Sequence, residues 1–228
     1  LGHAVAGDIP RAQAAYEDAD GLLGGLTDDE LAERVDAAAY LTSAATYLDR
    51  FDDAVIVAER ALRVGRAAGR LHPTLLPALG AAHLMRGRLE LAAAILGEGV
   101  EASRLASAAG GAQEALELAQ EAVELTAQLA ESVLSGWAAM ALARAAVLAG
   151  RPDDAIAVFP NGASALDTVP GAWRLIGLEA LASALAGTGR LAEAGEVVAA
   201  ARAHAAPLAL PMAWTWAERA AAQVGYHA

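Results

Sequence analysis

The stretch GRPDDAIAVF, residues 150–159, contains the phrase on which the fold depends: a glycine, four intervening residues and then an alanine. The phrase recurs, begun each time by a small or turn-forming residue, and its alanines are Ala12, Ala54, Ala92, Ala115, Ala155 and Ala194. Successive alanines are 42, 38, 23, 40 and 39 residues apart. Four of these five distances indicate a unit near 40 residues, which is typical of solenoids of stacked helix pairs.

Another helix, the first helix of each pair, is predicted upstream of each full phrase. Leucine stands thirteen positions before the alanine, and a small residue or threonine follows it, at Leu41, Leu79, Leu142 and Leu181. The turn between the two helices contains Asp49, Gly87, Gly150 or Gly189. Alanine supplies 64 of the 228 residues, which favours closely packed helices, and no strand-like alternation occurs. We predict an all-α chain with helices over residues 8–23, 28–48, 52–68, 74–86, 89–106, 112–129, 131–149, 152–165, 172–187, 191–205 and 212–224.

The units resemble tetratricopeptide repeats (TPR) of the lengthened kind found in the large ATP-dependent LuxR-type transcriptional regulators of bacteria, the MalT-like group. The phrases AQEALELAQEAVELT (112–126) and GRLAEAGEVVAAARAHA (189–205) carry the resemblance together with GRPDDAIAVF, and it covers essentially the whole chain. It implies one TPR-like domain over residues 1–228, a right-handed superhelical solenoid of antiparallel helix pairs. It also implies a preceding NTPase domain, a following helix-turn-helix, and an effector that releases autoinhibition and permits oligomerisation.

The spacing of 23 residues between Ala92 and Ala115 breaks this rhythm. It is short by roughly one helix and its connection, so a helix is predicted to be missing between residues 107 and 110. Three explanations stay open: the helix exists but was left out of this sequence, it was deleted, or the protein lacks it. The first is favoured, because the repeats on both sides would otherwise lose a neighbour. The opening LGHAVAGD has no initiator methionine or signal-type core, and the chain is expected to be a fragment of a longer protein.

Charge and composition exclude several classes of function. The formal net charge is −12, and all 16 basic residues are arginines without an arginine-rich run, so direct contact with nucleic acid or anionic lipid is not expected. The charge-free stretch SVLSGWAAMALA (132–143) is shorter than the ~20 residues of a spanning helix, so we predict no membrane segment. The absence of cysteine excludes disulfides and is compatible with the cytoplasmic location that we predict.

No residue pattern supports catalysis. The glycine pairs in GLLGG and AAGG lack the lysine and serine or threonine of a phosphate-binding loop. The carboxylate pairs in TDDE, FDD and RPDD fall at predicted helix starts, where they favour capping. No metal-ligand spacing joins the five histidines, His3, His72, His83, His204 and His227. We therefore predict no metal, no cofactor and no enzyme activity.

The concave surface lined by first helices is the expected binding site. In one repeat the TPR pattern places Trp137, Met140 and Arg144 inward, and in the next Glu179 and Ser183. The first full pair contributes Asp36, Ser43 and Tyr47. Tryptophans also stand near the start of first helices at Trp173 and Trp214, with Trp216 two residues on.

Aromatic rings beside an arginine and a few acids suit an amphipathic small-molecule effector or a peptide. The alternative is that the tryptophans fill space between alanine-rich helices, and that the face of Trp214, Ala217 and Ala221 seats a further repeat. The leading hypothesis is the sensor region of a LuxR-type regulator, with self-association as a further expectation. A stand-alone protein-interaction scaffold is the second hypothesis and an enzyme the third. Arg144 is nearly alone among inward basic residues, which favours a small molecule over a peptide terminus.

Overall fold

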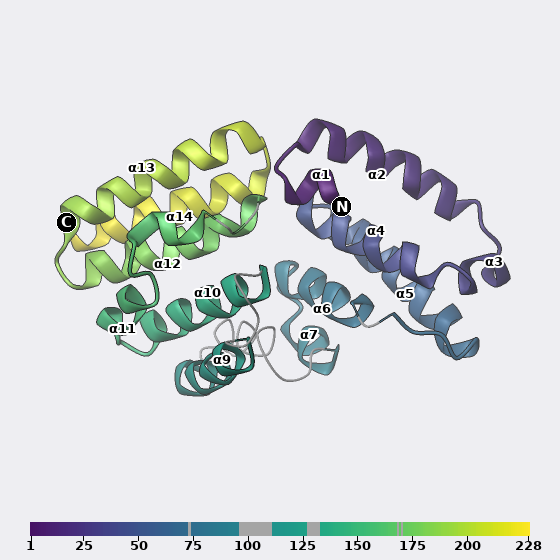
Figure 1. Cartoon of the computed structure of the whole chain (residues 1–228), viewed down its shortest axis with the longest axis horizontal. Coiled ribbons are helices and arrows are strands. Elements are labelled where there is room, and N and C mark those ends of the chain that lie inside the picture. Colours follow the sequence, from purple (N-terminus) through teal and green to yellow (C-terminus); the bar gives the residue numbers. More distant parts are fainter. Residues whose placement is uncertain (73, 96–110, 127–132, 168, 170) are drawn as a thin grey trace. The chain divides into compact units, whose positions relative to one another are not determined.

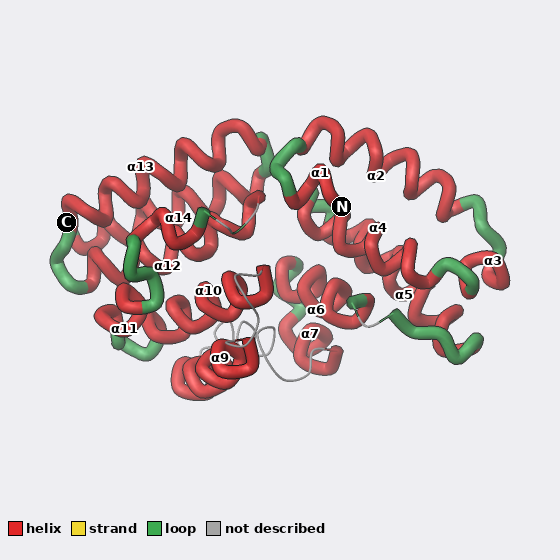
Figure 2. The backbone as a smooth tube through the Cα atoms, viewed as in Figure 1, coloured by secondary structure: helices red, strands yellow, loops and turns green. Residues whose placement is uncertain are grey.

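The computed structural model describes residues 1–72, 74–95, 111–126, 133–167, 169 and 171–228. Every regular element in these ranges is a helix and none is a strand, which confirms the predicted all-α class (Figure 2). The chain divides into two compact units, Leu1–Gly97 and Glu98–Ala228. Residues 107–110, where a helix is predicted to be missing, lie outside the described residues.

The first unit is a run of helices in which neighbours along the chain pack together (Figure 1). Helix α4 packs against both α5 and α6, and α6 packs against α5 and α7. Helix α3 packs on α5. The elements are α1 (Gly2–Val5), α2 (Ile9–Gly24), α3 (Asp28–Ala32), α4 (Val35–Tyr47), α5 (Phe51–Ala67), α6 (Leu75–Met85) and α7 (Leu89–Ile95).

The second unit is arranged around α12, which packs against α10, α11, α13 and α14. Helix α10 also packs against α9 and α11, and α13 against α14. The elements are α9 (Ala112–Thr126), α10 (Val133–Leu148), α11 (Pro152–Ala157), the 3-10 turns η1 (Gly162–Leu166) and η2 (Gly171–Trp173), α12 (Arg174–Gly187), α13 (Leu191–Leu208) and α14 (Pro211–His227). Contacts therefore join α10 and α12 to both of the helices that follow each of them, as they do α4 in the first unit.

The same turn joins the helices at each described repeat of the phrase. Its first residue adopts a left-handed backbone conformation, with φ of 78° at Gly7, 59° at Asp49, 71° at Gly87, 71° at Gly150 and 78° at Gly189. The amide of the following residue then donates to a carbonyl five positions back, at 2.9 Å in every case. This bond is that of a Schellman cap, which favours glycine because a Cβ is strained at positive φ. The turns predicted from the phrase are thus confirmed.

The alanine of each phrase is buried. Ala54, Ala92, Ala115, Ala155 and Ala194 are 0% exposed and Ala12 is 5% exposed. Because a methyl group fills so little space, these positions let neighbouring helices approach closely. The aligned leucines are buried as well at three of their positions, Leu41, Leu79 and Leu181.

Two predicted helices are wrong in their extent. The helix expected over residues 28–48 is two helices, α3 and α4, because α3 turns to pack on α5 and is fixed at its start by a capping box between Thr27 and Glu30. The helix expected over 152–165 ends after Ala157, because Pro160 cannot continue it and the chain passes into η1. The other predicted helices agree within a few residues wherever the structure describes them. Within the described residues, no helix has both the length and the apolar character needed to cross a membrane.

Candidate functional site

Helix α12 carries two buried polar residues inside an otherwise apolar segment. Glu179 is 5% exposed and Ser183 is 9% exposed, and because they are four residues apart they share one face of the helix. A buried carboxylate requires a partner to offset the loss of hydration. Arg219 of α14 supplies it, donating from a guanidinium nitrogen to the Glu179 carboxylate at 3.3 Å.

The guanidinium of Arg219 also lies over an indole ring. Its central carbon is 4.9 Å from the ring centroid of Trp216, and the guanidinium carbon of Arg144 on α10 is 4.9 Å from the same centroid. Both distances fall within the range of cation–π attraction. Arg144, Glu179, Trp216 and Arg219 thus form one group drawn from α10, α12 and α14, the arginine–tryptophan cluster.

Two further tryptophans meet beside α12. The ring centroids of Trp137 on α10 and Trp173 in η2 are 5.7 Å apart, with the planes tilted by 43°. Such tilted pairs are favourable for aromatic rings. The indole nitrogen of Trp137 is buried and has no hydrogen-bond partner among the described residues, so one donor at this contact is unused there. Of the predicted residues, Trp137, Trp173, Arg144 and Glu179 therefore all come together around α12.

Met140 plays a packing role in this arrangement. Its side chain is 4% exposed and lies at the close approach of α10 to α12. A Cβ at Gly177 would come within 3.0 Å of Met140 Cγ and within 2.6 Å of Leu166 Cδ2, so the absence of a side chain there makes the contact fit. The residue predicted to line a groove instead fills the core.

Helix α14 carries one exposed and one buried tryptophan. Trp214 is 42% exposed, whereas Trp216 is 7% exposed. The buried face of α14 consists of Ala213, Trp216, Ala217 and Ala220. Proline begins this helix at position 211, and from that start Trp216 shares the three- and four-residue spacing of the buried alanines. That spacing was the signal that could have selected Trp216 over Trp214.

The remaining predicted residues belong to the first unit. Tyr47 is half-buried near the end of α4, and Asp36 is exposed near its start. The Ser43 hydroxyl donates to the carbonyl oxygen of Ala39 at 3.0 Å, a bond within the same helix. The cluster is therefore built from residues of the second unit, and Trp216 and Arg219 are the members that sequence reasoning missed.

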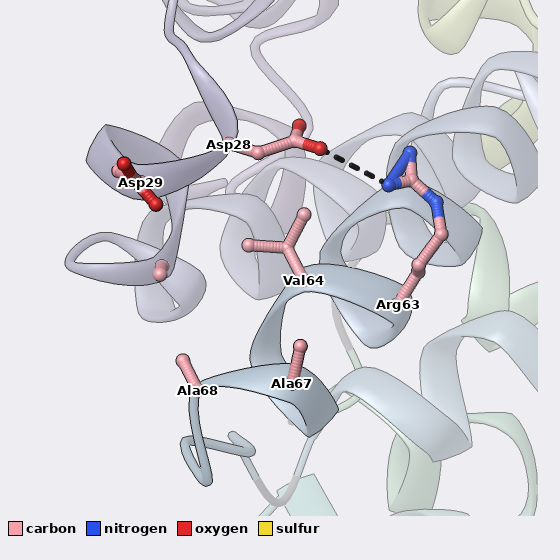
Figure 3. A pocket seen from close by; sticks show the side chains of 7 residues that line it. Asp28, Asp29, Arg63, Val64, Ala67 and Ala68 are labelled. Carbon is pink, nitrogen blue, oxygen red and sulfur yellow. Dashed lines mark hydrogen bonds and ion pairs between the residues drawn. The ribbon is translucent and has the colours of Figure 1, made fainter.

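A small hollow of the first unit lies between α3 and α5 (Figure 3). Figure 3 shows Asp28 reaching across Val64 toward Arg63, and their charged groups are 3.2 Å apart. Asp28 also accepts from Arg60, so its charge is already satisfied. The hollow measures about 270 Å³, below the ~300 Å³ at which organic ligand sites begin. We assign no ligand to it.

Among the described residues, no group of three or more histidine, aspartate or glutamate side chains could hold a metal ion. Comparison of the chain with models of protein families, with curated proteins and with solved structures gives no match.

Proposed function

We propose that the chain is the TPR-like α-solenoid sensor region of an ATP-dependent LuxR-type transcriptional regulator that acts in the cytoplasm. The recurrent left-handed turn, the buried alanines and the packing of α4, α10 and α12 on the two helices that follow each of them support a right-handed solenoid of helix pairs. The effector is a small molecule that binds to the surface of α10, α12 and α14, and its binding releases autoinhibition and permits self-association.

The observation that carries this proposal is the arginine–tryptophan cluster. A carboxylate is expensive to bury, and α12 would pack as well with an apolar residue at position 179. Here the buried charge is placed where three successive first helices meet, and it is neutralised by a side chain that is itself half-exposed. An arrangement of this kind offers hydrogen-bonding groups, a charge and an indole ring to a ligand in one place.

The cluster also gives the ligand a way to act. Arg219 holds α14 to α12 through Glu179, and Arg144 holds α10 to α14 through Trp216. A ligand that engages these groups stabilises one arrangement of the three helices over another. Only that difference in affinity shifts the equilibrium between a repressed and an active regulator.

Tryptophan fluorescence tests the proposal, with Trp216→Phe as the critical variant and Trp214→Phe as its control. Both residues are on α14, but Trp214 is exposed and outside the cluster. The dialysable fraction of a bacterial extract should change the emission of the natural chain and of Trp214→Phe, and should leave Trp216→Phe nearly unchanged. Equal responses of both variants would place the ligand elsewhere, and no response of the natural chain would reject the effector site.

A protein-interaction scaffold is the second candidate, favoured by exposed aromatic residues on the same helix. Trp214 is 42% exposed and Tyr226 is 86% exposed, and such residues are enriched at protein interfaces. This function predicts a response to the macromolecular fraction of the extract, and it predicts that Trp214→Phe abolishes that response.

A further inference from the structure

The second unit contains a hollow of about 410 Å³ that no predicted site residue lines. It lies on the other side of α12 from the arginine–tryptophan cluster. Leu181 and Leu185 of α12 line it, and each follows Glu179 or Ser183 by two residues, a rotation of about 200° around a helix with 3.6 residues per turn. The full lining is Ile156, Phe159, Pro160, Asn161, Gly162, Ala163, Leu181, Leu185, Arg190, Glu193, Glu196 and Val197.

The early end of α11 is associated with this hollow. Helix α11 has 6 residues, whereas the corresponding helices α5 and α13 have 17 and 18. Past Pro160 the chain turns away through Gly162, whose φ is 59°, and continues as η1. The end of α11 and η1 form one wall, α13 forms another, and α12 lies beneath them.

The floor of the hollow is apolar. Phe159, Leu181, Leu185 and Val197 are each at most 6% exposed, so their side chains are packed in place before any ligand arrives. The volume falls within the ~300–1,000 Å³ typical of small-molecule sites. The apolar part of a small organic ligand could therefore pack against these side chains.

The rim carries an unneutralised negative charge. The Arg190 guanidinium donates to both carboxylate oxygens of Glu193, at 2.7 and 2.6 Å, and this contact is the main reason that the pKa of Glu193 is lowered. Glu196 also lines the hollow, three residues further along α13. In the part of the chain that the structure describes, its carboxylate has no ion-pair or hydrogen-bond partner.

We propose that this hollow binds an amphipathic organic cation. The apolar part of the ligand lies on Phe159, Leu185 and Val197, and an ammonium or guanidinium group reaches the carboxylate of Glu196. The net charge of −12 favours approach of a cation and disfavours an anion of the same size. This site does not depend on the proposed effector site, because none of its lining residues belongs to the cluster.

The test uses phenethylammonium as the probe and phenylacetate as an anion with the same ring. Methyl-resolved NMR follows Ile156, Leu185 and Val197 during titration, with Leu75 of the first unit as the reference. Phenethylammonium should shift the three methyl signals in a saturable way and leave Leu75 in place. Phenylacetate should have little effect. Absence of saturable shifts at the three residues, or equal shifts with the anion, would overturn the proposal.

The charge is tested with Glu196→Gln and with Glu121→Gln as its matched control. Glu121 is an exposed carboxylate of α9 in the same unit and outside the hollow, so both variants remove one charge. Glu196→Gln should weaken phenethylammonium binding about threefold, the value expected for an exposed ion pair, and Glu121→Gln should leave it unchanged. Equal affinities of the two variants would reject Glu196 as the recognition group.

Discussion

Removal of the Arg219 side chain should destabilise the second unit more than removal of an arginine of similar exposure that pairs only with an exposed carboxylate. In Arg219→Ala the Glu179 carboxylate, which is 5% exposed in the natural chain, loses its guanidinium donor. A hydrogen bond to a charged group contributes about 1.5–3 kcal/mol, and the half-exposed position of Arg219 reduces this to about 1–2 kcal/mol. Loss of the cation–π contact with Trp216 adds about 0.5–1 kcal/mol. We expect a total near 2 kcal/mol.

The four tryptophans provide the assay, because all of them lie in Glu98–Ala228. Thermal unfolding followed by tryptophan emission therefore reports on this unit. For a unit of this length, a loss of 2 kcal/mol corresponds to a fall in midpoint of about 8 °C. The control is Arg202→Ala, which removes two hydrogen bonds of 2.9 Å to Glu218 between α13 and α14. Both members of that pair are about half-exposed, so only a small shift is expected.

A double variant separates the buried charge from the other effects of truncation. Glu179→Gln removes the charge that Arg219 neutralises, so adding it to Arg219→Ala should recover most of the lost stability. If Arg219→Ala lowers the midpoint no more than Arg202→Ala, the burial of Glu179 does not make the Glu179–Arg219 pair more stabilising than an exposed ion pair. If the effects of Glu179→Gln and Arg219→Ala simply add, the two side chains are not coupled and the cluster has no electrostatic basis.

Three further predictions concern local features of each unit. Arg60→Gln should destabilise the first unit by about 2 kcal/mol, measured as unfolding followed by far-UV circular dichroism, because Arg60 donates to Asp28 and to the carbonyls of Leu23 and Leu26. Arg63→Gln loses only the pair with Asp28 and should cost less stability. Burial lowers the pKa of His83, so the unfolded chain binds more protons than the folded chain, and the first unit should lose stability as pH falls through about 6.5. His83→Gln should flatten this pH dependence, and an unchanged slope would contradict the prediction. Gly65→Ala should lower the melting midpoint because its Cβ would lie 2.3 Å from the Arg70 carbonyl oxygen. Gly195→Ala, where a Cβ on α13 meets open space, should instead raise the free energy of unfolding by up to about 1 kcal/mol.

The features predicted from sequence are those that local chemistry determines. A left-handed turn needs glycine or a residue such as Asp49, and a close helix contact needs alanine, so the repeat could be read from spacing alone. The end of α11 was equally readable, because Pro160 stands inside the predicted helix and prolines interrupt helices. The break between α3 and α4 had no such marker, since it arises from the packing of α3 on α5.

The orientation of the tryptophans depended on helix register, which spacing of repeats does not specify. Trp214 and Trp216 differ by two residues, or about 200° of rotation, so an error of two positions exchanges a buried ring for an exposed one. Only the burial of Ala213, Ala217 and Ala220 fixes the face that α14 presents to α12.

Arg219 was missed for a different reason: it lies one repeat away from its partner Glu179. Glu179 and Arg219 are 40 residues apart, which is the length of one repeat, and Trp137 and Trp173 are 36 residues apart. When each first helix packs on the next, as α10 does on α12 and α12 on α14, a residue on the contacting face meets residues close to its own position one repeat later. A buried acid on such a helix therefore calls for an arginine one repeat length away. In a chain without lysine that search has few candidates, and it selects Arg219 from the sequence alone.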